Sequence, residues 1–334
     1  MGSPRNAVKT SSVSPRMKTL VYHAGALGDF ISMLPAIGAW RRLRPNHDVI
    51  LLGKPAFGEV GVQSGYFDDV WDVERASWAW LFAPGAGCPA YAVDWFSGIT
   101  SALLFTAAHG ALALRLHALG VSEVLAHNPL PSHRVPIVRH YLSLLVQSEP
   151  GIADCGPHLN ASQSFASGAQ TLLQGVRGAV ALHAGSGSIR KNWPLENFQA
   201  LSAHLQNRGF PVIWLSGPAE GRINAPSGCL SVKNAALPTL IHIFKQCRAY
   251  IGNDSGISHC AAAVGLPSLV LFGPSDPVVW KPFGDHVHQV IAPGGCTPCH
   301  MNRVEREDCA DWCMKRISVD EVISAFDRLF KLHY

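Results

Sequence analysis

The stretch Met-Lys-Thr-Leu-Val-Tyr-His-Ala-Gly-Ala-Leu-Gly-Asp-Phe, residues 17–30, decides the expected fold. It begins as a short apolar strand and runs directly into a glycine loop, and a helical pattern then follows as far as Arg44-Pro45. A second apolar strand at 48–52 completes a strand, loop, helix, strand unit. Because doubly wound parallel sheets begin in this way, the chain is predicted to be an α/β protein.

The second half of the chain repeats this order. An apolar run at 179–183 leads into a second glycine loop at 184–187. The other elements predicted there are a helix from about Leu195 to Gly209, strands at 211–215, 248–252 and 268–272, and a small-residue helix at 257–264. Two such sheets that face one another place both glycine loops at the carboxyl ends of strands, where ligands bind in α/β proteins.

The length of 334 residues favours two domains, since it exceeds what one ordinary core supports. The best linker is the Pro-, Gly- and Ser-rich stretch 150–167. We therefore expect a disordered tail at 1–16 and two Rossmann-like domains at 17–160 and 161–315. A C-terminal helix at 316–334 is expected to pack back on the N-terminal domain.

Composition narrows the class of protein. Hydrophobic residues make up 48% and charged residues 15%, which excludes intrinsic disorder. The net charge of +4 is too small to indicate nucleic acid, although it suits an anionic substrate or membrane surface. The tail lacks the apolar core of a signal peptide, so we expect a cytoplasmic protein whose nine cysteines are reduced. Ser, Thr, Gly and His interrupt the uncharged stretch 95–114, which favours a buried helix over a membrane span.

The loop Gly185-Ser186-Gly187 is a candidate anion site. Glycine lets backbone N–H groups approach an anion closely, and Lys191 or Arg190 would supply the opposite charge. This arrangement suits a diphosphate. The alternative is a plain turn followed by a solvated helix cap, which has the same residue pattern.

A second candidate is the turn Asp254-Ser255-Gly256, which ends a strand and opens a helix that contains His259. The first N–H groups of that helix would point at a ligand above the sheet. Asp254 or Ser255 could equally act as the helix cap, and the two roles are compatible. His259 lies among small apolar residues, so it is either a structural histidine or a ligand contact.

Asp29 follows Gly28 in the first glycine loop and is the candidate general base. Sugar transfer with inversion requires one carboxylate to accept the proton of the acceptor hydroxyl as the anomeric carbon is attacked. The alternative is that Asp29 is the N-cap of a helix beginning at Phe30.

Four cysteines near the C-terminus, Cys296, Cys299, Cys309 and Cys313, have the spacing of a structural four-thiolate zinc site. The alternative is a surface loop of reduced cysteines. The acidic group at 68–72 alternates like a short surface strand after a turn, so no catalytic metal is assigned.

Taken together, these motifs resemble the ADP-heptose:lipopolysaccharide heptosyltransferase family, glycosyltransferase family nine. That family has the GT-B fold, in which two Rossmann-like domains have parallel sheets facing a central cleft. The resemblance covers roughly residues 17–330 and rests on Gly-Ala-Leu-Gly-Asp-Phe (25–30), His-Ala-Gly-Ser-Gly (183–187), Lys-Asn-Trp-Pro (191–194), Ser-Gly-Pro-Ala-Glu (216–220), Gly-Asn-Asp-Ser-Gly-Ile-Ser-His (252–259) and Leu-Phe-Gly-Pro (271–274).

The resemblance implies a role for each matching residue. Asp29 would be the general base, Lys191 would contact the donor phosphate, and Glu220 would contact the nucleotide ribose. The remaining donor-site residues that it implies line the diphosphate pocket and are Asp254, Ser255, Gly256 and His259. The family's chemistry is inverting and needs no catalytic metal, so Lys191 and helix N-termini would meet the charge of the leaving group.

The sequence thus predicts a glycosyltransferase that moves heptose from ADP-heptose to a lipopolysaccharide core or related lipid-linked glycan. We expect a monomer with no cofactor besides the donor and no nucleic-acid partner, at the cytoplasmic face of the inner membrane with peripheral association. Two alternatives stay open: a GT-B sugar-nucleotide epimerase or hydrolase, and a non-catalytic nucleotide-binding scaffold. The joint presence of Asp29, Lys191 and Glu220 disfavours the scaffold.

Overall fold

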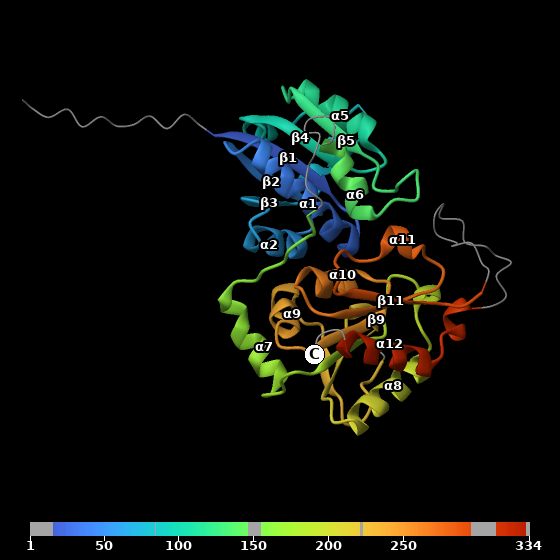
Figure 1. Cartoon of the computed structure of the whole chain (residues 1–334). Helices are drawn as coiled ribbons and strands as arrows, with labels where there is room; N and C mark the ends of the chain where they lie inside the picture. Colours follow the sequence, from blue (N-terminus) through green and yellow to red (C-terminus); the bar gives the residue numbers. More distant parts are fainter. Residues whose placement is uncertain (1–15, 84, 146–154, 221–222, 295–311, 332–334) are drawn as a thin grey trace, which may run out of the picture.

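The computed structural model describes residues 16–83, 85–145, 155–220, 223–294 and 312–331. Within these ranges the strands form two sheets, one in each half of the chain, and every strand pair is parallel (Figure 1). This arrangement confirms the predicted α/β class with two Rossmann-like domains.

The first sheet belongs to the N-terminal half. Its strands, in spatial order, are β3 (Asp69–Asp72), β2 (His47–Gly53), β1 (Met17–His23), β4 (Ile99–Phe105) and β5 (Glu123–His127). The helices of this half are α1 (Leu27–Leu43), α2 (Pro55–Gln63), α3 (Ala79–Phe82), α4 (Ala90–Trp95), α5 (His109–Ala118) and α6 (Ile137–Leu142). The predicted strand at 48–52 and the short acidic strand at 68–72 are both present, as β2 and β3.

The second sheet belongs to the C-terminal half. Its strands, in spatial order, are β8 (Leu230–Lys233), β7 (Val212–Ser216), β6 (Val180–His183), β9 (Ala249–Asn253), β10 (Ser268–Phe272) and β11 (Val287–Ile291). The helices of this half are α7 (Ala166–Leu173), α8 (Leu195–Asn207), α9 (Leu237–Phe244), α10 (Gly256–Ala263), α11 (Pro277–Trp280) and α12 (Val319–Lys331). The five-stranded first sheet has the strand order 3-2-1-4-5, and the six-stranded second sheet extends this order to 3-2-1-4-5-6. These are orders of doubly wound folds, whose carboxyl edge binds ligands.

The prediction of one buried helix across residues 95–114 is wrong. Residues 99–105 form β4, which lies between β1 and β5, and α5 begins only at His109. A strand inside a parallel sheet is covered on both faces, so its sequence is a continuous apolar run that periodicity does not separate from a buried helix. Within the described ranges, no helix is both long and apolar enough to cross a bilayer.

Helix α12 packs within the C-terminal half, against α8 and β11, as Figure 1 also indicates. Its apolar side chains Val322, Phe326 and Leu329 are buried in the same cluster as Phe198 and Trp214 of that half. The expectation that residues 316–334 pack back on the N-terminal domain is therefore wrong for the described part of that segment. An amphipathic helix buries its apolar stripe where apolar surface is available, and here α8 offers it.

The two halves meet where α1 and α10 pack against one another, and one continuous hydrophobic core crosses this contact. The helices approach so closely that a Cβ atom on Gly256 would lie 2.7 Å from the Leu27 Cβ and 3.0 Å from the Gly28 backbone nitrogen. A salt bridge also connects Arg134 of the N-terminal half to Asp276 of the C-terminal half, whose side chain is 1% exposed. The carboxyl edge of β1 therefore faces the carboxyl edge of the second sheet.

Gly256→Ala tests the close contact between α1 and α10. Its methyl group would collide with Leu27 and Gly28, and overpacking of this kind destabilises a protein by about 1–3 kcal/mol. We expect a lower urea midpoint of unfolding. The matched control is Gly110→Ala in α5, whose added Cβ meets no atom within 4 Å. Equal midpoints for wild type and Gly256→Ala would contradict the described contact.

Candidate active site

A cavity of about 410 Å³ lies between the halves, at the carboxyl edge of the second sheet. One part of its wall is polar and includes His183, Ser186 and Glu220. Another part is apolar and is formed by Leu27, Leu215, Val232, Ala235, Leu240 and Ile257. A cavity of this kind suits a ligand that is apolar at one end and polar at the other.

Glu220 is held in place by its own turn and by β6. Its Oε2 atom accepts a hydrogen bond from the Gly217 N–H at 2.8 Å and lies 3.8 Å from the His183 Nε2 atom. The His183 ring, together with the Gly217 N–H, lowers the pKa of the Glu220 carboxyl below its ordinary value despite its partial burial. Gly185 is required here, because a Cβ atom at that position would lie 2.1 Å from the Glu220 Oε1 atom. The result is an ionised acceptor on the cavity wall.

The Gly-Ser-Gly loop is organised by side chains around it. The Ser186 Oγ atom lies 2.6 Å from the Asn192 Oδ1 atom and accepts the Ser188 N–H at 3.2 Å. The fully buried Asn253 accepts the Trp193 N–H at 2.9 Å and donates to the Ala184 carbonyl at 2.8 Å. Sequence reasoning missed this role of Asn253. Its position within the Asn-Asp-Ser-Gly motif was the available signal, but its partners lie about 60–70 residues away.

Lys191 supplies the cation beside this loop. Its Nζ atom lies 2.7 Å from the Asp254 Oδ2 atom, and the Lys191 side chain is 26% exposed whereas that of Asp254 is 7% exposed. Asp254 therefore holds the ammonium group in place while leaving part of it accessible, and both residues line a second, smaller cavity between the halves. An anion that enters the cavity would meet this charge.

The N-terminus of α10 points its first N–H groups toward the same place. Ser255 is the N-cap residue, and its Oγ atom accepts the Ser258 N–H at 3.4 Å, which confirms the capping role expected for this turn. The Ser258 hydroxyl donates to the Asn253 carbonyl at 2.5 Å and so holds the turn in place. A helix N-terminus carries partial positive charge, so the turn favours a negatively charged group.

His259 joins the two halves. It is 6% exposed, and its Nδ1 atom lies 3.3 Å from the Ser32 Oγ atom of α1. Burial lowers the pKa of His259 to about 4. The ring is therefore neutral at pH 7 and contributes hydrogen bonding rather than charge. His259 also lines the smaller cavity, so it has both the structural position and the ligand-facing position that were expected as alternatives.

The smaller cavity has a volume of about 250 Å³ and adjoins the larger one, because both are lined by Gly187, Ser255 and Gly256. Asp29 and Lys191 both line it. The structure thus brings candidate residues of both glycine loops, Glu220 and the Asp254 turn to the walls of two adjoining cavities.

Asp29 lies in the first turn of α1, which begins at Leu27 with Ala26 as its N-cap. The alternative that Asp29 caps a helix beginning at Phe30 is therefore wrong. A carboxylate in the first helical turn is stabilised by the partial positive charge of the N-terminus. Burial and the nearby Asp29 charge together raise the pKa of Tyr141 well above its ordinary value, which places that ring in the surroundings of Asp29.

His23, at the end of β1, was missed by sequence reasoning. Its ring is 2% exposed, and neither ring nitrogen has a hydrogen-bond partner among the described residues. Burial, assisted by the Lys54 charge, lowers its pKa to about 4. Gly25 lies between this ring and Asp29, since a Cβ atom there would lie 3.1 Å from His23 Nε2 and 3.5 Å from Asp29 Oδ2.

The predicted zinc site falls mostly outside the described residues, which do not include Cys296, Cys299 or Cys309. Cys313 is described and lies beside Gly273. In the part of the chain that the structure describes, His, Cys, Asp and Glu side chains form no group of three or more arranged to hold a metal ion.

Comparison with known proteins gives the family. The model of glycosyltransferase family 9 (heptosyltransferase) matches residues 99–310, and the chain belongs to this family. Lipopolysaccharide heptosyltransferase 3 of Escherichia coli is 30% identical over 152 residues, which are 42% of this chain and 44% of that protein. Lipopolysaccharide heptosyltransferase 1 of Pseudomonas aeruginosa is 32% identical over 126 residues, which are 36% of this chain and 35% of that protein. The matched segments thus span less than half of either relative.

Solved structures share the whole fold. A family 9 glycosyl transferase from Veillonella parvula has a TM-score of 0.78 at 18% identity, and the match covers 94% of this chain and 97% of that one. The Escherichia coli ADP-heptose lipopolysaccharide heptosyltransferase II has a TM-score of 0.72 at 15% identity over 95% and 99% of the two chains. These similarities confirm the GT-B architecture.

The two buried histidines, His23 and His259, predict acid sensitivity of the fold. Their pKa values of about 4 lie below the ordinary 6.5, so the unfolded chain takes up protons first as the pH falls below about 6.5. The contribution of each neutral histidine to the free energy of unfolding is therefore fully present near pH 7. It decreases by roughly 1–3 kcal/mol for each histidine as the pH falls to about 4. Urea midpoints measured at several pH values across this window check the loss.

His259→Gln should lose less stability than wild type between pH 7 and 5, because it removes one of the two titrating groups. The control is His158→Gln, at an exposed position, which should follow the wild-type profile. A wild-type midpoint that stays constant over this range would contradict the assignment.

Proposed function

We propose that this protein is an inverting heptosyltransferase that transfers heptose from ADP-heptose to a lipopolysaccharide core or related lipid-linked glycan. The observation that carries the proposal is a pair of adjoining cavities that meet at the N-terminus of α10, the larger lined by Glu220 and the smaller by Lys191 and Asp29. Membership of family 9 supports the reaction class. Two solved structures of the Escherichia coli heptosyltransferase WaaC have the same fold. One contains ADP, and the other contains ADP-2-deoxy-2-fluoro heptose.

The donor is proposed to lie along these two cavities. The adenine ring occupies the apolar part, near Val232 and Leu240, and the ribose hydroxyls donate to the Glu220 carboxylate. The diphosphate lies over Gly187, Ser255 and Gly256, where the N-terminal N–H groups of α10 face it. The sugar then projects into the smaller cavity.

The reaction follows from this placement. Asp29 accepts the proton of the acceptor hydroxyl, whose oxygen forms a bond to the anomeric carbon of the donor. The bond from that carbon to the diphosphate breaks, and its electron pair goes to the leaving oxygen of ADP. Lys191 and the helix N-terminus stabilise the charge that develops there. Because His259 is neutral, it positions the domains rather than neutralising phosphate.

The donor is the only small molecule needed besides the acceptor. The acceptor approaches from the N-terminal half, which contributes Asp29, and its lipid anchor places the enzyme at the cytoplasmic face of the inner membrane as a peripheral monomer.

Asp29→Asn should reduce heptosyl transfer by about 10²–10⁴-fold, because the amide does not accept the acceptor's proton. ADP binding should stay close to wild type, since Asp29 does not line the larger cavity. Transfer is measured with ADP-heptose and a truncated lipopolysaccharide, and binding by calorimetry with ADP.

Two matched variants complete this experiment. Asp285→Asn, at an exposed position of the C-terminal half, should keep full transfer. Asp254→Asn should weaken ADP binding, because it releases Lys191 from its 2.7 Å contact. Unchanged transfer by Asp29→Asn would reject it as the base, and release of free heptose at the same rate without acceptor would favour the hydrolase.

A further inference from the structure

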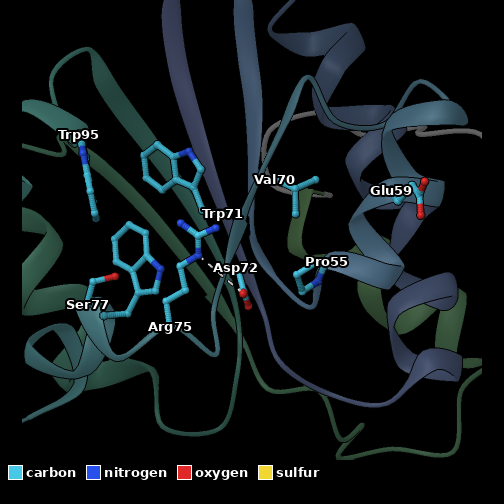
Figure 2. Close-up of a pocket in the computed structure, with 9 residues that line it drawn as sticks. Pro55, Glu59, Val70, Trp71, Asp72, Arg75, Ser77 and Trp95 are labelled. Carbon is cyan, nitrogen blue, oxygen red and sulfur yellow. Dashed lines mark ion pairs between the residues drawn. The ribbon is translucent and has the colours of Figure 1, made fainter.

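A separate cavity of about 380 Å³ lies in the N-terminal half, and the proposed donor site does not use it. Its wall is formed by Pro55, Glu59, Val70, Trp71, Asp72, Arg75, Ser77, Trp78 and Trp95. Figure 2 shows Trp71 and Trp95 on one side of it and Pro55 and Glu59 of α2 on the other, with Arg75 and Asp72 between them. Three indole rings and three charged side chains therefore surround one space.

The cavity lies at the sheet edge that carries Asp29. Asp72 is the last residue of β3, and Pro55 follows closely after the end of β2. In the parallel sheet these ends share an edge with the end of β1, which leads to Asp29. Because β3 is two strands away from β1, the lateral separation along the edge is about 10 Å. A glycan chain that has one hydroxyl at Asp29 can extend along this edge.

The aromatic part of the wall is ordered by ring packing. The Trp71 and Trp78 rings are stacked with centroids 5.4 Å apart and planes 15° apart, and the Trp78 and Trp95 centroids are 5.0 Å apart. Trp95 is 40% exposed, although large aromatic side chains are usually buried. Its face offers an apolar surface to the C–H face of a sugar ring.

The polar part of the wall is suited to hydroxyl groups. The Asp72 carboxylate lies 3.7 Å from the Arg75 Nε atom, and the Arg75 side chain is 74% exposed. Glu59 adds a second carboxylate, so the lining carries two negative charges and one positive charge. This balance disfavours a phosphate or carboxylate ligand. Carboxylates accept hydrogen bonds from hydroxyl groups and a guanidinium donates to them, which is the pattern that a polyol needs.

One donor of the wall lacks a protein partner. The Trp78 side chain is 3% exposed, and its Nε1–H group has no acceptor among the described residues. Buried N–H groups in folded proteins are nearly always paired. By contrast, the Trp71 Nε1 atom donates to Asp69 at 3.1 Å.

We infer that this cavity is a binding subsite for a neutral pyranose ring of the acceptor glycan, with Trp95 as its stacking face and Asp72, Arg75 and Glu59 as its hydroxyl partners. The inference rests on the proposed function, because it assigns the cavity to the acceptor. It places a recognised sugar residue away from the reacting hydroxyl, so the subsite contributes acceptor binding and not chemistry.

Saturation-transfer NMR with a panel of methyl glycosides tests the subsite directly and requires no transfer reaction. Wild-type protein should give ring-proton signals with methyl hexopyranosides, and saturating ADP should leave these signals in place because it occupies a different cavity. Trp95→Ala should reduce the signals at least tenfold. Its matched control, Phe82→Ala, removes an aromatic ring that is 42% exposed but lies outside the cavity, and it should retain them.

ADP binding by Trp95→Ala verifies that this variant is folded, and Arg75→Ala, at an exposed position, serves as the second variant and should also weaken the signals. The subsite would be overturned if wild-type protein gave no glycoside signals or if Trp95→Ala gave signals equal to those of wild type. It would also be overturned if ADP displaced the glycosides or if glucose 6-phosphate gave stronger signals than they do. If the wild-type protein bound glycosides but did not transfer heptose, the proposed function would be overturned and the subsite would not.

Discussion

The contact on which the rest of the structure depends is the approach of two helix N-termini, those of α1 and α10, across the boundary between the halves. Gly28 and Gly256 permit it, because a Cβ atom on Gly256 would collide with the backbone of Gly28. The hydrogen bond between His259 and Ser32 adds a polar tie beside it. Each helix follows a glycine turn at a strand end, so this single contact brings the carboxyl edges of both sheets together.

The electrostatics of the site follow from the same contact. Two helix N-termini concentrate partial positive charge where the two cavities adjoin, and Lys191 adds a full charge held by Asp254. The buried His259 stays neutral, so it does not strengthen this field. Asp29 stands in the first turn of α1, on the N-terminal side of the same space. The contact between α1 and α10 therefore brings the anion site of one domain next to the candidate base of the other.

Much of this arrangement could be predicted from local sequence. Each glycine loop follows a short apolar strand and precedes a helical pattern, so residues 17–30 and 179–187 identified the two sheets and their functional edge. The capping role of Ser255 was equally local. Glu220 could be assigned only through resemblance to a family, because a single acidic residue after a turn carries no distinctive pattern.

Other features depend on tertiary packing and could not be predicted. The apolar run at 99–105 is a strand because β1 and β5 cover its edges, which its own periodicity does not reveal. The hydrogen-bond partners of Asn253 are set by elements distant in sequence. The direction in which α12 packs depends on the surface that α8 presents. The cavity around Trp95 likewise combines α2, β3 and the segment before β4.

A crystal structure of the protein with ADP would show whether the diphosphate binds where the two helix N-termini meet. We expect the ribose hydroxyls at Glu220 and the β-phosphate within about 3 Å of both the Lys191 Nζ atom and an N–H group at the start of α10. A diphosphate bound away from the α10 N-terminus, with Lys191 still paired only to Asp254, would contradict this expectation.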